Sequence, residues 1–236
     1  MDLCNVTAGK LLGAFLLLSP TAWAQEPAST ADSPIREGMV INLRFISEPA
    51  AGSDLQAKGD ASVAYLRGER GRHENESVQL TLRPDSGNPT SFTTNEGADS
   101  GTDYLIIDSG DPVTKDWFRP GTIWGFHQIL LLDSVDRSDF ETFIHRYWAP
   151  TRSDALPDSK VIFLKELTGP QAGEFSYIWL IDSEETRDYY FPESTVPSEM
   201  YTEFEKGWDW IYDQEHLGRY LAAPEDQLFT DFVVER

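Results

Sequence analysis

Three histidines in the second half of the chain are the residues best suited to acid–base chemistry. An imidazole titrates near neutral pH, so a histidine in a cleft can take a proton from a substrate or bind a metal ion. His127 alternates with apolar residues and is expected to be buried, whereas His145 is expected at a helix surface. His216 lies near the end of a second predicted helix. His127 and His216 are therefore the candidate catalytic residues, although a lone buried histidine is more often structural.

The second predicted helix, about residues 198–220, carries aromatic and charged side chains on one face. At about 100° per residue, its aromatic face continues into Glu215 and Arg219. An ion pair at the end of the helix would explain these charges without a ligand. If this end returns to the strand that holds His127, the same residues would instead line a pocket. The predicted ligand-binding residues are Gln128, Tyr201, Trp208, Tyr212, Glu215 and Arg219.

Motifs of several common enzyme classes are missing from the sequence. It contains no HExxH, G-x-S-x-G, P-loop or G-x-G-x-x-G pattern. The single cysteine, Cys4, lies in an N-terminal segment that we expect to be removed. Acidic residues between 133 and 141 could attract calcium, but acids at a helix start already favour the helix dipole. We therefore predict no metal site and no cofactor.

The hydrophobic pattern after residue 122 predicts the order strand, helix, strand, strand, helix, strand. Strands are expected at 123–133, 161–167, 175–182 and 228–234, with a short helical turn at 184–191. A Ser138–Glu141 capping box is expected to open the first helix, which Pro150 is expected to end after Trp148. This order predicts an α+β fold with a ferredoxin-like βαββαβ unit. Both faces of its strands are apolar, so a second layer must cover the sheet.

The N-terminal part shows shorter apolar alternations, at 39–46, 61–67, 78–82 and 104–107. They could form a small β-rich layer packed on the C-terminal unit, or a degenerate first copy of that unit. Gly59 and Gly68 interrupt the only window that could hold the first helix of such a copy, which favours the β-rich layer. The expected organisation is a signal peptide (1–24), a flexible leader (25–38), a β-rich region (39–116) and an α+β domain (117–236).

The first residues are typical of a secretory signal peptide. Lys10 precedes an apolar run from Leu11 to Leu18, and the triplet Ala22-Trp23-Ala24 suits cleavage. The run is much shorter than the roughly 18 residues that a spanning helix needs. We therefore expect export to the periplasm or the outside. The formal net charge of −21 argues against binding to nucleic acid or, after cleavage, to a membrane surface.

The order of elements, the FETFIHRYW helix and the FSYIWLID strand resemble the dimeric α+β barrel superfamily over about residues 122–235. This group includes antibiotic-biosynthesis monooxygenases, NIPSNAP-type proteins and haem-degrading enzymes. The resemblance implies a homodimer or an internal pseudo-dimer, in which a second sheet covers the first. Cofactor-independent oxygenases of the group hold an aromatic substrate. The haem-degrading relatives use an Asn, a Trp and a His, and the first strand here offers Gln128 instead, so no catalytic role is transferred.

Three functions follow from these observations. The first is an exported protein that binds a small apolar or aromatic molecule between helices and sheet. The second is a cofactor-independent, monooxygenase-like enzyme with His127 or His216 as its base. The third is a dimerisation module without catalytic activity.

Overall fold

The structure is a computed structural model that describes residues 35–46, 62–84, 101–111, 113–213, 215–224 and 227–235. The predicted signal peptide and most of the predicted leader lie outside the described residues. Ile35, at the end of that leader, pairs with Val113 and is buried. Among the described residues, no helix combines the length and the apolar character needed to cross a bilayer.

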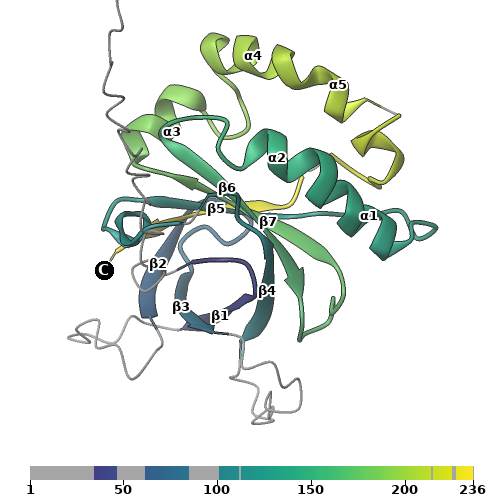
Figure 1. Cartoon of the computed structure of the whole chain (residues 1–236). Coiled ribbons are helices and arrows are strands. Elements are labelled where there is room, and N and C mark those ends of the chain that lie inside the picture. Colours follow the sequence, from purple (N-terminus) through teal and green to yellow (C-terminus); the bar gives the residue numbers. More distant parts are fainter. Residues whose placement is uncertain are drawn as a thin grey trace, which may run out of the picture. The chain divides into compact units, whose positions relative to one another are not determined.

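In the part of the chain that the structure describes, eight strands form one closed, antiparallel barrel in the order β1-β3-β2-β8-β5-β7-β6-β4 (Figure 1). Strands were predicted near all eight positions. Their bounds are β1 Met39–Ile46, β2 Ser62–Gly71, β3 Ser77–Pro84, β4 Thr102–Asp108, β5 Ile123–Gln128, β6 Ser159–Glu166, β7 Phe175–Ile181 and β8 Phe229–Val234.

The predicted fold class was wrong. Instead of a ferredoxin-like α+β unit with a separate covering layer, strands from both halves of the chain share one barrel. β8 pairs with both β2 and β5, and β4 pairs with β6, so the N-terminal strands complete the sheet. Apolar residues on both strand faces need cover on both sides, and here the barrel interior covers one face and the helices cover the other. The pattern alone does not distinguish the two arrangements.

The barrel interior is filled by side chains. Trp124, Ile178 and Phe232 point inward and pack against Ile41 and Leu80 from the N-terminal strands. An eight-stranded barrel has an interior of about the width that side chains can fill. The alternate residues of β5 to β8 point outward and lie under helices.

The helices lie against the outer side of the barrel formed by β5, β6 and β7 (Figure 1). One continuous helical segment contains α1 (Arg137–Phe143), a π-helical turn (Ile144–Trp148) and α2 (Ala149–Arg152). α3 spans Glu184–Tyr190, close to the predicted turn, and α4 (Glu199–Glu205) leads through a 3-10 turn (Lys206–Trp208) into α5 (Asp209–Tyr212). Two further 3-10 turns are Lys115–Phe118 and Leu217–Arg219.

Both ends of the first helix differ from the prediction. The N-cap is Asp136, whose side chain accepts a hydrogen bond of 2.8 Å from the Ser138 backbone N–H, so the Ser138–Glu141 box does not open the helix. Pro150 does not end it either. In the π-helical turn the Ala149 N–H donates to the Ile144 carbonyl, and this wider turn accommodates the proline. The helix thus continues to Arg152.

The second predicted helix is shorter than expected. It ends at Tyr212, because the backbone of the next residue, Asp213, is extended, with a ψ of 171°. The Asp213 carboxylate accepts hydrogen bonds from the backbone N–H groups of Glu215 (2.9 Å) and His216 (3.0 Å). An Asp side chain that bonds to the following amides offers the backbone an alternative to the helix. Glu215 and Arg219 are therefore not on the helix face that carries Tyr201 and Tyr212.

Candidate functional site

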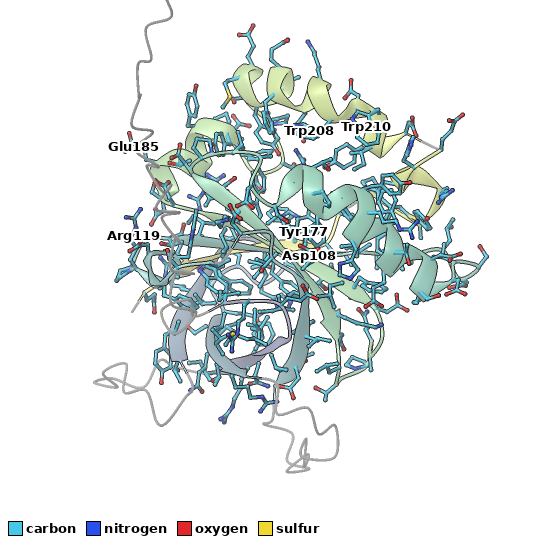
Figure 2. The ribbon with its side chains drawn as sticks, in the orientation of Figure 1. Asp108, Arg119, Tyr177, Glu185, Trp208 and Trp210 are labelled. Atoms are coloured by element: carbon cyan, nitrogen blue, oxygen red, sulfur yellow. The ribbon has the colours of Figure 1, made fainter. Side chains whose placement is uncertain are left out.

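A pocket of about 450 Å³ lies between the outer face of the sheet and the helices. Figure 2 shows Tyr177 on the sheet and Trp208 on the helical segment above it. Eight aromatic side chains line the pocket: Trp148, Tyr177, Trp179, Phe191, Tyr201, Phe204, Tyr212 and Phe229. Its charged lining residues are Arg70, Arg152, Arg187, Glu205, Asp209 and Asp231. Pockets of this volume, mostly apolar with a few polar groups, are typical of small-molecule sites.

The floor of the pocket comes from strand register. His127 pairs across the sheet with Tyr177 on one side and Phe229 on the other. The three rings stack, since the His127 ring lies 4.5 Å from Tyr177 at an angle of 7° and 5.6 Å from Phe229. His127 is only 8% exposed. Its imidazole is thus held in one orientation at the pocket floor.

An aromatic cluster around Trp179 forms a wall of the pocket. Its ring lies parallel to Tyr190 at 6.2 Å, and Phe191 and Tyr201 contact it at 5.6 and 5.5 Å. Tyr201 also contacts Phe204. These rings link β7 with α3 and α4, so they fix the helices over the sheet. They also offer flat apolar surfaces to a ligand.

One polar group in the pocket is Arg152, whose side chain is 12% exposed. Its guanidinium forms an ion pair of 3.5 Å with Glu205 and lies over the rings of Tyr212 (5.3 Å) and Phe204 (5.9 Å). Burial raises the pKa of Glu205, while the nearby Arg152 opposes this. Arg152 was missed in the sequence because Pro150 was expected to end the helix before it.

A second polar group is Asp231 on β8. Its partly buried carboxyl has a pKa raised to about 6 by burial, against the opposing effect of Arg187 and Arg70. These two arginines donate their hydrogen bonds to other residues. Arg187 donates to Glu69 (3.0 Å) and Asp188 (3.0 Å), and Arg70 donates to Asp188 (2.7 Å). Within the described residues, none of their hydrogen bonds reaches Asp231.

Gly125 lies opposite Asp231 in the pairing of β5 with β8. A Cβ atom on this glycine would be 3.1 Å from the Asp231 Oδ1 atom and 3.4 Å from the His127 Nε2 atom. Its backbone has no positive φ, so local conformation does not require a glycine. A glycine inside a strand often marks a place that a ligand approaches closely.

The structure brings together some of the predicted site residues and separates others. His127, Tyr201 and Tyr212 line the pocket, whereas Trp208 lines a second hollow beside Pro150. Gln128 ends β5, and Glu215 and Arg219 are exposed. Arg219 lies over the Tyr220 ring at 4.6 Å.

The second candidate base, His216, lies on the turn after α5. Its Nδ1 atom is 2.9 Å from the Asp213 carboxylate, and its ring meets Trp210 edge-on at 5.2 Å. The pocket lining given by the described residues contains His127 and not His216.

Comparisons with known proteins find little. No family model matches the chain, and no curated protein matches it. Among solved structures, a protein from Lactobacillus acidophilus NCFM, whose assignment as a monooxygenase is provisional, aligns with a TM-score of 0.43 and 9% identity. The alignment covers 85% of this chain and 95% of that one. These values do not establish a shared family, so membership in the dimeric α+β barrel superfamily stays a prediction.

Proposed function

We propose that the chain binds a small aromatic molecule in the pocket between helices and sheet. The observation that carries this is the pocket of about 450 Å³ lined by eight aromatic side chains. Burial of a flat apolar ligand against such rings is favourable, because aromatic pairs add about 0.5–1.5 kcal/mol to the gain from buried area. Two charged groups of the lining, the guanidinium of Arg152 and the carboxyl of Asp231, offer polar contacts to such a ligand.

The proposal is tested with N-phenyl-1-naphthylamine, a neutral dye whose fluorescence rises in apolar surroundings. The full chain should bind the dye saturably. Trp179→Ala removes a pocket ring and should weaken binding by about tenfold or more. Trp210→Ala is the matched control, because Trp210 is 44% exposed and is not among the lining residues. Phe204→Ala repeats the test should the Trp179 variant fail to fold. Equal binding by parent, pocket variants and control would contradict the proposal.

A second candidate function is a cofactor-independent oxygenase with His127 as its base. The supporting observation is that His127 lies at the floor of an aromatic pocket, where a bound substrate would meet it. A histidine suits proton removal near neutral pH. Oxygen uptake with hydroquinone-type substrates should then disappear in His127→Asn and persist in His216→Asn. Uptake that survives in both variants, or that is absent from the parent, would reject this candidate.

We also propose that residues 1–24 direct export, on the basis of Lys10, the apolar run and the Ala22-Trp23-Ala24 triplet. The ligand would then be met outside the cytoplasm.

A further inference from the structure

The inference concerns the place where β5 and β8 lie side by side at the pocket floor. Asp231 Oδ1 and His127 Nε2 both lie within 3.4 Å of the point where a side chain on Gly125 would begin. The space above Gly125 is thus bordered by a carboxylate and an imidazole, with Phe229 and Trp179 among the other lining residues. Because residue 125 has no side chain, the Asp231 carboxyl and the His127 ring can both sit close to this strand, and both side chains line the pocket where a polar group of the ligand can meet them.

The charges around Asp231 determine which ligand group this space accepts. Arg70 and Glu69 of β2 face the Asp231 carboxyl. Arg187 and Asp188 of α3 and His127 of β5 also face it. Arg187 and Arg70 are already engaged by Glu69 and Asp188, at 2.7 to 3.0 Å. Two cations thus stand among three carboxylates, which disfavours an anionic ligand group at this point. An ionised carboxylate only accepts hydrogen bonds, so it requires a donor.

We propose that Asp231, with Gly125 and His127, is a specificity site that accepts a hydrogen bond from a neutral O–H or N–H group on an aromatic ligand. This proposal rests on the proposed function, since it names the ligand class for the same pocket. The aromatic walls hold the ring, and the carboxylate selects rings that carry a donor. A site built to bond a hydroxyl discriminates strongly against an analogue that lacks the donor, because a buried acceptor is then left unpaired.

The test compares 2-naphthol with 2-methoxynaphthalene, which share the ring system and differ in the donor. Calorimetric titration of the full chain at pH 7.5 should show about tenfold or greater preference for 2-naphthol, the size expected for a hydrogen bond to a charged group. The preference should fall as the pH drops from 7.5 to 4.5, since Asp231 with a pKa of about 6 gains a proton there.

Two variants assign the preference to this site. Asp231→Asn removes the charge and should reduce the preference to about threefold or less, while 2-methoxynaphthalene still binds as in the parent. Gly125→Ala adds a carbon 3.1 Å from the carboxylate and should weaken 2-naphthol binding more than 2-methoxynaphthalene binding. Asp133→Asn, at an exposed carboxyl outside the pocket lining, is the control and should leave the preference unchanged.

The outcomes separate the two proposals. If the parent binds both naphthalenes equally, or prefers 2-naphthol as strongly after Asp231→Asn, the specificity site is refuted and pocket binding stands. If the parent binds neither compound, the proposed function itself fails. A preference that is lost in Asp231→Asn and kept in Asp133→Asn supports the site.

Discussion

Replacing Asp231 by asparagine should change how the free energy of unfolding depends on pH. The pKa of this carboxyl is raised from 3.8 to about 6 in the folded chain, mainly by burial. The folded state therefore holds the proton more tightly than the unfolded state does. The stability that this group contributes is fully present below about pH 4 and is lost as the pH rises through about 6.

The magnitude follows from the two pKa values. Each pH unit of difference corresponds to about 1.4 kcal/mol, so ionisation of Asp231 should cost the folded state about 3 kcal/mol at pH 7.5. Asp231→Asn does not ionise. Its advantage over the parent should therefore grow by about 2 to 3 kcal/mol between pH 4 and pH 7.5.

Urea unfolding followed by tryptophan fluorescence at several pH values measures this difference. All other titrating groups are common to parent and variant and cancel in the comparison. Asp209→Asn controls for the exchange of carboxylate for amide at an exposed position. Curves of parent and Asp231→Asn that run parallel from pH 4 to 7.5 would refute the reasoning, because the carboxyl would then titrate alike in the folded and unfolded chain.

Three further predictions concern the core, the Arg152–Glu205 ion pair and export. Phe140→Ala should lower the free energy of unfolding by about 3–5 kcal/mol, because Phe140 is fully buried, whereas the exposed Tyr147→Ala should lower it by less than about 1 kcal/mol; urea titration compares them. Arg152→Met should cost about 1–2 kcal/mol, since it leaves the Glu205 carboxylate without its cation while water still reaches that carboxylate, and adding Glu205→Gln should recover most of this loss in the same assay. When the full-length chain is made in a secreting bacterium, it should be cleaved after Ala24, which removes residues 1–24. Mass spectrometry that finds only the uncleaved chain would contradict export.

The positions of the strands could be predicted from the sequence because alternation is a local signal. Residues 39–46 show it, whereas residues 175–181 form a nearly continuous apolar run of strand length, and both are strands. The closed barrel could not be predicted, because closure depends on partners far apart in the chain. Leu66 pairs with Val234 across the β2–β8 boundary, and nothing in either strand specifies that partner.

The site was predictable where residues follow a regular face. His127, Tyr201 and Tyr212 came from strand alternation and helix periodicity, and all three line the pocket. Arg152 was missed because a π-helical turn carries the helix past Pro150, which the usual effect of proline does not suggest.

The sequence does contain a signal for Asp231 and Gly125. Asp231 interrupts an apolar strand, and Gly125 interrupts the strand that also holds His127. Each departs from the local preference for apolar, β-branched residues, and such departures gather at functional sites. A shared role can be inferred only from the register of β5 and β8, which places the two residues opposite each other.

The position of β8 has a consequence for biosynthesis. β8 comes last among the described strands in chain order, yet it lies between β2 and β5 and joins the two halves of the barrel. While the ribosome is still making the earlier strands, β2 and β5 each lack this neighbour. Long-range strand pairing of this kind is slow and waits for the last segment. If the chain is exported as proposed, late closure would leave the barrel unformed until β8 has been made, and an unfolded chain is the form that passes through a narrow secretion channel.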